Sequence, residues 1–351
     1  MPAGKTTLSG CSEFMGTSTP GTIVTPQCLL DRAASIGKGR ARAAALPHIP
    51  APFGVESDEM STDDPVFQTV IAPFVVALLV VAASRLVGGG RRAELLAGVG
   101  VVLGILVGYA LLEGVPQFPP PASKQKLFYL IAFGGLVGLV VDWLGRPSLI
   151  DALAIVAFPA VCLAWLASRQ LNAGPELTLL VTLAVLWAGS AAALRRLADA
   201  SDRGAGVTGP VLLIVAAIGT AGVALLGRTA TLALLSGAIA AGAGAIALWN
   251  YVASIGGGGR ASFGRTALLA AAGGLAVICA LLVLDTPTAS RVALVGILLV
   301  PFSETVARRL RLGSGAAERI LSPIVHGAVA AVPALAAIGF AYWASGGTLT
   351  Q

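Results

Sequence analysis

The chain has few charged and few chemically reactive side chains. Of its 351 residues, 11% are charged and 6% are aromatic, and it contains four cysteines and two histidines. Ordinary soluble domains carry about a quarter of their residues as charged side chains, so the low charge excludes a soluble globular enzyme. Two histidines and four cysteines also leave few groups for a metal site or for a nucleophile with an adjacent base.

Enzyme motifs are absent as well. The sequence contains no His-Glu-x-x-His zinc pair, no Gly-x-Ser-x-Gly nucleophile turn and no complete Walker-type phosphate-binding loop. Four glycines at 256–259 precede Arg260, but they lie in a short segment between two apolar runs and are interpreted as a flexible linker. We therefore predict that the protein is not an enzyme and holds no cofactor or metal.

The sequence does contain long apolar runs, and hydrophobic residues make up 56% of it. A helix needs about 20 apolar residues to cross a hydrocarbon core about 30 Å thick. Hydropathy therefore predicts an all-α fold, a polytopic membrane bundle of about ten transmembrane helices in a lipid bilayer. The predicted spans are residues 66–84, 95–112, 127–144, 149–167, 177–194, 210–226, 229–252, 266–284, 292–307 and 320–344.

Basic residues predict the orientation of these spans, because cytoplasmic loops hold an excess of Lys and Arg. Segments after even-numbered spans hold five: Lys124, Lys126, Arg169, Arg228 and Arg291. Segments after odd-numbered spans hold thirteen: Arg85, Arg91, Arg92, Arg146, Arg195, Arg196, Arg203, Arg260, Arg265, Arg308, Arg309, Arg311 and Arg319. We predict a plasma-membrane protein, in the inner membrane if bacterial, with both termini on the non-cytoplasmic side. The net charge of +6 mostly reflects these segments, so no nucleic-acid partner is expected.

Residues 1–59 differ from the rest of the chain. They are polar and rich in Gly, Pro, Ser and Thr, and they lack the basic segment and apolar stretch of a secretory signal. Met60 begins Met-Ser-Thr-Asp-Asp-Pro, a short acidic segment that crosses a membrane easily. We interpret residues 1–59 as a disordered or non-native extension and predict that Met60 is the true start. The alternative is a disordered cytoplasmic interaction tail, which would invert the predicted topology.

The ten spans divide into two sets of five, at residues 66–194 and 209–344. Because each set has an odd number of spans, the two would have inverted topology, as in many carriers. The sets share hydropathy but no residue pattern, so the inverted repeat is a hypothesis.

Small residues predict which helices pack closely, because backbones in lipid approach each other only where side chains are small. Gly100, Gly104 and Gly108 recur every four residues in the second span. Gly134 and Gly138 repeat the pattern in the third, and small residues dominate the middle of the seventh. We expect these helices in the interior of the bundle and interpret the stripes as packing surfaces, with a substrate path as the functional alternative.

Prolines inside spans predict kinks, because proline lacks the N–H that a helix interior requires. Pro159 lies near the middle of the fourth span, and Pro301 directly precedes Phe302, Ser303 and Glu304 in the ninth. Kinked and broken helices are common in transporters, where freed carbonyls can face a cavity.

Ionisable residues inside spans are the candidates for a functional site. Asp142 lies four residues before Arg146, a spacing that allows a helical ion pair, and Asp151 opens the fourth span on the same side. Glu304 precedes Arg308 by four residues, and His326 lies about 10 Å into the tenth span by helical rise.

These residues support two hypotheses. In the first, Glu304 and His326 form a protonatable pair in a cytoplasmic-side vestibule, with Ser303, Ser322, Asp142 and Asp151 nearby. In the second, Glu304 pairs with Arg308 by snorkelling to the interface, and His326 makes one structural hydrogen bond between helices. No Asp, Glu, Lys or Arg lies near the middle of any predicted span, which weakens ion-coupled transport.

The segment 113–126 is the most distinctive loop, with three consecutive prolines that favour a stiff polyproline conformation. It is interpreted either as an outer docking site for a protein partner or as a rigid cap between two helices. The oligomeric state is not predicted.

Three functions are compatible with this sequence. The first is a permease for a small organic or lipidic substrate, working without ion coupling. The second is a non-transporting scaffold or assembly subunit, and the third, ranked last, is a membrane transferase. A vestibule reaching mid-depth favours transport, whereas a solidly packed bundle with an exposed apolar face favours a scaffold.

Overall fold

The structure is a computed structural model that describes residues 64–86, 91–174, 176–203, 206–256, 261–286, 291–310 and 316–345. These residues all belong to one structural unit, Asp58–Gln351. Residues 1–59, and with them the prediction that Met60 is the true start, lie outside the described residues.

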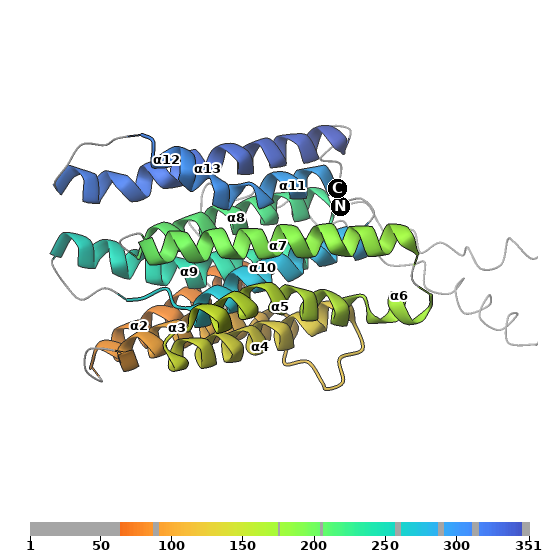
Figure 1. Ribbon diagram of the computed structural model, residues 1–351, viewed down its shortest axis with the longest axis horizontal. Coiled ribbons are helices and arrows are strands. Elements are labelled where there is room, and N and C mark those ends of the chain that lie inside the picture. Colours follow the sequence, from red (N-terminus) through yellow and green to blue (C-terminus); the bar gives the residue numbers. More distant parts are fainter. Residues whose placement is uncertain are drawn as a thin grey trace, which may run out of the picture. The chain divides into compact units, whose positions relative to one another are not determined.

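The described residues are helical, with no strand among them, so the predicted all-α class is confirmed (Figure 1). In chain order the segments are a π-helical turn η2 (Phe67–Ile71), α2 (Ala72–Leu86), α3 (Arg91–Glu113), α4 (Ser123–Leu144), α5 (Ser148–Leu166), α6 (Ser168–Asn172), α7 (Leu177–Arg203), α8 (Thr208–Leu226), α9 (Ala230–Gly256), α10 (Arg265–Asp285), α11 (Arg291–Leu298), the 3₁₀ turn η3 (Val300–Phe302), α12 (Ser303–Ala307) and α13 (Ala316–Ala344).

Within the described ranges, nine helices are long and apolar enough to cross a membrane. The protein is therefore a multi-pass helical membrane bundle. The ninth predicted span, 292–307, is helical but broken into α11, η3 and α12. Pro301 lies in η3 and cannot donate the backbone hydrogen bond that a continuous α-helix needs there.

Two helices continue past their predicted ends. α7 runs on to Arg203, nine residues beyond the predicted end at 194, and α9 runs to Gly256 instead of 252. The hydropathy pattern ends where the apolar run ends, whereas the backbone hydrogen bonds continue through polar residues. The extension of α7 carries Asp199 and Asp202 into the structure as helical residues.

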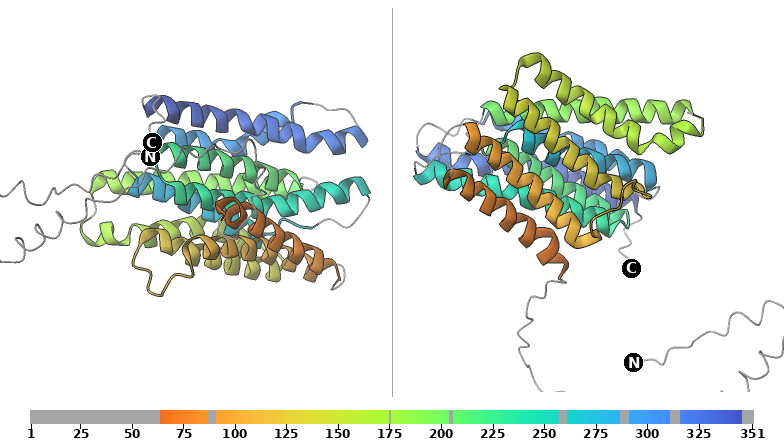
Figure 2. Two further views of the ribbon diagram at one scale, coloured as in Figure 1. Left: turned by 180° about the vertical axis from the view of Figure 1, so that it is seen from behind. Right: turned by 90° about the horizontal axis from the view of Figure 1, so that it is seen from below.

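α10 is the central helix of the bundle. It contacts α3, α4, α5, α7, α8 and α9, and 89% of its apolar stretch is buried inside the protein. Two views show it crossing between its neighbours (Figure 2). The small-residue patterns predicted α3, α4 and α9 as interior helices but did not single out α10, whose two glycines, Gly273 and Gly274, are adjacent in sequence. Because α10 packs on α3 and α4 while α9 packs on α2 and α3, the two predicted halves are interleaved.

The predicted stripes on α3 and α4 are contact surfaces. A Cβ atom on Gly138 would overlap the Arg265 carbonyl oxygen, and one on Gly134 would lie 2.7 Å from the Leu269 carbonyl oxygen. The α4 backbone therefore rests directly on α10. In α9, by contrast, nothing lies within 4 Å of a Cβ placed on Gly237, so small size at that position serves no close contact.

The segments that follow odd-numbered predicted spans meet at one end of the bundle. We call it the basic end and define it by Arg146, Arg195, Arg203, Arg265 and Arg308. Ion pairs join these ends directly, for example Arg146 to Asp202 at 3.3 Å and Arg265 to Asp202 at 2.7 Å. The opposite end carries the segment 113–126 and α6 (Figure 1). The alternation of segments predicted from basic residues therefore agrees with the fold, and the membrane side that each end faces stays a prediction.

The proline-rich segment folds against the opposite end. Lys124 pairs with Glu113 at 2.8 Å, the Tyr129 hydroxyl donates to the Pro116 carbonyl at 2.7 Å, and Arg169 donates to the Pro121 carbonyl at 2.9 Å. Phe118 remains 75% exposed. These contacts fit a rigid cap between α3 and α4, and docking of a protein partner on this loop stays a prediction.

Candidate functional site: a buried arginine–aspartate cluster

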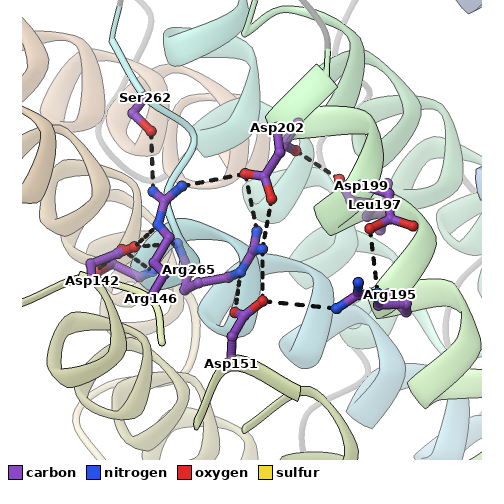
Figure 3. A network of polar contacts seen from close by, with 11 residues as sticks. Asp142, Arg146, Asp151, Arg195, Leu197, Asp199, Asp202, Ser262 and Arg265 are labelled. Carbon is purple, nitrogen blue, oxygen red and sulfur yellow. Dashed lines mark hydrogen bonds and ion pairs between the residues drawn. The ribbon is translucent and has the colours of Figure 1, made fainter. Parts of the chain in front are cut away.

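A buried arginine joins three helices at the basic end. Arg265, the first residue of α10, is 3% exposed. Its guanidinium donates to Asp151 of α5, with Nε to Oδ1 at 2.5 Å and Nη2 to Oδ2 at 3.0 Å. It also donates to Asp202 of α7, with Nη2 to Oδ2 at 2.7 Å (Figure 3). One side chain thus connects α5, α7 and α10.

Asp142 of α4 caps the beginning of α10. Its carboxylate accepts the backbone N–H groups of Arg265 at 3.0 Å and Thr266 at 2.8 Å, together with the Thr266 hydroxyl at 2.8 Å. The first N–H groups of a helix have no partner within it and are usually capped by a local side chain. The residue before α10 is Gly264, and a Cβ there would overlap the Asp142 carboxylate. The cap is therefore supplied by another helix.

Arg146 lies beside this cap. Its Nε donates to Asp142 at 2.7 Å, which confirms the predicted ion pair between residues four apart. Its Nη atoms make longer bonds of 3.3 Å to Asp202 and to the Ser262 hydroxyl. Gly145 ends α4 in a left-handed conformation with φ of 86°, and Arg146 follows with φ of 58°. This turn places the Arg146 side chain over the end of its own helix (Figure 3).

Arg195 of α7 is held more loosely. It lies 3.3 Å from Asp199 and 3.9 Å from Asp151, its side chain is 54% exposed, and it makes no hydrogen bond to any described residue. Arg203 then links Asp199 at 3.6 Å to Glu304 at 3.9 Å. The ion pairs therefore continue from α7 to α12.

We call Asp142, Arg146, Asp151, Arg195, Asp202 and Arg265 the arginine–aspartate cluster. It holds three guanidinium groups and three carboxylates, so its formal charge is zero. Removing charges from water is costly, and a buried pair offsets that cost only with good geometry and further hydrogen bonds. Such a cluster contributes little net stability, while ionisable groups in a membrane helix bundle usually mark a functional site.

A cavity of about 650 Å³ opens beside the cluster between α5 and α7. Volumes of this order suit small-molecule ligands. Charged residues line one part of it, and Ala152, Ile155, Val156, Ala191 and Ala192 line another.

The cavity extends to about half the length of α5. From Ser148 to Val156 the helical rise is about 12 Å, and the 19 residues of α5 span about 28 Å. At this depth the Trp187 indole donates to the Val156 carbonyl at 2.9 Å and links α7 to α5. Pro159 lies three residues after Val156, and its missing N–H leaves the Ile155 carbonyl without its helical donor.

α7 also borders two further spaces. A cavity of about 480 Å³ lies at the opposite end of the helix, among Gln170, Glu176, Thr178, Leu284 and Arg291. On another face of α7, toward α8 and α10, is an apolar crevice of about 30 Å³, lined by Leu194, Leu213, Leu275, Cys279, Ile297 and Pro301. α7 is the least buried of the nine long helices, at 17%.

The residues of the predicted vestibule are divided between several places. Asp142 and Asp151 belong to the cluster. Glu304 is buried and pairs with Arg308 and Arg203, both at 3.9 Å. The Ser303 hydroxyl donates to the Val300 carbonyl at 2.7 Å within the broken helix.

His326 has its contacts within its own helix. Its Nδ1 is 2.7 Å from the Ser322 carbonyl oxygen and 3.3 Å from the Ser322 hydroxyl, both on α13. No hydrogen bond or ion pair joins Glu304 to His326 in the described part of the chain. Glu304 pairs with Arg308 as the second hypothesis has it, but the His326 contact is not the bond between helices that this hypothesis expects, and the proton-coupled vestibule stays a prediction.

Sequence reasoning did not identify Arg195, Asp202 and Arg265 as site residues. Arg195 and Arg265 were used only to orient the spans, and Asp202 lies beyond the predicted end of its span. Arg265 directly precedes an uncharged run, so its proximity to the core was visible, but its partners are 114 and 63 residues away in sequence.

Comparison with known proteins does not assign the chain to a family. No protein-family model matches the sequence, and no curated protein matches it either. Within the described residues, no group of three or more His, Cys, Asp or Glu side chains could hold a metal ion.

Proposed function

We propose that the protein is a membrane permease that moves a small organic solute along α7. The observation that carries this proposal is the cavity of about 650 Å³ at the basic end, which reaches about half the length of α5. Charged residues line it at the basic end, of which Asp151 and Arg265 are buried, and apolar residues line it further along α5. A non-transporting scaffold has no need of a vestibule of this depth, and a vestibule of this kind favours transport.

The position of α7 supports the proposal. This helix borders both cavities and the apolar crevice, so a movement of α7 would change all three spaces. It makes ion pairs at the basic end through Asp202 and Arg195, and nearer its middle the Trp187 indole donates to α5. Polar contacts can be exchanged for contacts with water or solute, whereas the apolar packing of α10 cannot.

The broken helix supports it as well. Pro301 and Ile297, from the interrupted segment, line the crevice where α7 faces α8 and α10. Discontinuous helices lie at the substrate sites of many transporters, because they can change shape without breaking a long hydrogen-bonded helix. The crevice lining holds no charged residue, and the proposed transport is accordingly driven by the solute gradient without ion coupling.

Transport can be tested in liposomes that contain the purified full chain. The assay measures the influx of anionic, cationic and neutral solutes of similar size. We expect protein-dependent influx of one class, and we expect Ala191→Trp, which fills the cavity, to abolish it. Ala157→Trp is the control, because Ala157 is exposed on α5 and does not line the cavity. Absence of influx for all three classes by a folded protein would favour the scaffold.

A further inference from the structure

We propose that the cavity binds an organic anion with a short apolar part, and that Arg195 is the principal contact for its charged group. The identification of this anion as the transported solute rests on the proposed permease function. The inference follows from which charged groups around the cavity already have close partners and which do not.

The two carboxylates that line the cavity are already engaged. Asp151 accepts hydrogen bonds from Arg265 on both oxygens, at 2.5 and 3.0 Å. Asp202 accepts from Arg265 at 2.7 Å and from Arg146 at 3.3 Å. A cationic ligand would have to displace a buried guanidinium, which would then lack a partner at a site where unpaired charge is costly.

The guanidinium of Arg195 is available. It has ion pairs of 3.3 and 3.9 Å with Asp199 and Asp151, but no hydrogen bond to any described residue. A guanidinium offers five donors in a planar fork that matches a carboxylate or phosphate. An anion in the cavity can therefore form charge-assisted hydrogen bonds with Arg195 without breaking the bonds around Arg265.

The donors in the cavity wall favour the same class of ligand. Three arginines line it, namely Arg146, Arg195 and Arg265, against two aspartates, Asp151 and Asp202. The cluster as a whole is neutral, because Asp142 balances the third arginine from outside the lining. The preference for an anion therefore rests on guanidinium donors that face the cavity and not on net charge.

The other part of the cavity has no charge. Ala152, Ile155 and Val156 of α5 face Ala191 and Ala192 of α7 across it. These five small or branched apolar residues leave space for a short hydrocarbon group, whose burial is favourable. The expected ligand thus combines an anionic head with a short apolar tail.

Two sources could provide this chemistry, namely a water-soluble amphiphilic anion and the head of an anionic lipid. The test uses the full chain in nanodiscs of phosphatidylcholine and measures binding by calorimetry. The probes are hexyl phosphate, hexyltrimethylammonium as a cation with the same tail, and inorganic phosphate.

We expect hexyl phosphate to bind at least tenfold more tightly than hexyltrimethylammonium, and more tightly than inorganic phosphate. Arg195→Gln is expected to weaken hexyl phosphate binding about tenfold or more, because charge-assisted hydrogen bonds are among the strongest in proteins. Arg309→Gln is the control, since it removes one exposed arginine at the same end that does not line the cavity. Ala152→Leu, with Ala157→Leu as its control, is expected to weaken binding of the hexyl chain but not of inorganic phosphate.

A second arm identifies the source. In nanodiscs that contain phosphatidylglycerol, loss of hexyl phosphate binding, together with lipid retained by the wild-type chain but not by Arg195→Gln in native mass spectrometry, assigns the site to lipid. Unchanged hexyl phosphate binding assigns it to a soluble anion. Both results support an anion site. Equal or tighter binding of the cation, or an unchanged affinity in Arg195→Gln, overturns the proposal.

The binding test and the transport test can contradict their proposals independently of each other. Anion binding without influx of any solute contradicts the permease but leaves the anion site in place. Influx of a neutral or cationic solute without anion binding contradicts the anion site but leaves the permease in place.

Discussion

The Asp142 carboxylate of α4 accepts the backbone N–H of Thr266 in α10 at 2.8 Å, across 124 residues of sequence. The same carboxylate accepts from the backbone of Arg265 and from the Arg146 guanidinium. The start of the central helix is therefore fixed by a neighbouring helix, and Arg265 is held at the position from which it reaches both Asp151 and Asp202.

Asp142→Asn should destabilise the protein by about 1.5–3 kcal/mol, the cost of losing charged hydrogen bonds to buried donors. An asparagine has one carbonyl oxygen and cannot accept the bonds that two carboxylate oxygens accept here. Thermal unfolding in detergent, followed by circular dichroism, measures the change. Asp199→Asn is the control, because its ion pairs of 3.3 and 3.6 Å are more exposed and should contribute about 0–1 kcal/mol. Equal effects of the two substitutions would contradict the capping role.

Arg265→Met should cost about 3–5 kcal/mol, because it leaves the buried Asp151 carboxylate without its principal partner. Combining it with Asp151→Leu and Asp202→Asn should recover much of that stability, since no unpaired charge then remains. The measurement is the unfolding midpoint of the single and triple variants. A triple variant that is less stable than Arg265→Met would show that the cluster contributes more than mutual neutralisation.

Gly138→Leu should prevent α4 from packing against α10, because even a Cβ at this position overlaps the Arg265 carbonyl oxygen. A loss of folded, monodisperse protein in size-exclusion chromatography is expected. Gly237→Leu is the matched substitution on α9, where a Cβ meets nothing within 4 Å. It should leave the elution profile unchanged. The same profile for both variants would contradict the packing role of the α4 stripe.

The predicted orientation can be tested with single cysteines in a chain whose four natural cysteines are replaced. Leu310→Cys lies at the basic end and Gln117→Cys at the opposite end, and both positions are exposed. A membrane-impermeant maleimide applied to intact cells should label only Gln117→Cys. Labelling of only Leu310→Cys would invert the topology, as the alternative interpretation of residues 1–59 requires.

The sequence by itself determined the helices, because a continuous apolar run of about twenty residues can satisfy its backbone in lipid only as a helix. It also predicted a kink at Pro301, through the missing N–H, where the structure has a break, and it determined the Asp142–Arg146 pair, through helical spacing of four residues. Each of these properties depends on residues close together in the chain, and the alternation of Lys and Arg follows from the same local order.

Only the tertiary structure decided which charged residues meet. Arg265 reaches Asp151 and Asp202 because the ends of α5, α7 and α10 come together, and no local pattern encodes a contact across 114 or 63 residues. The central position of α10 and the cavity between α5 and α7 have the same origin. Lipid gives helices no hydrophobic preference for one another, so close packing and specific polar contacts decide which helices become neighbours.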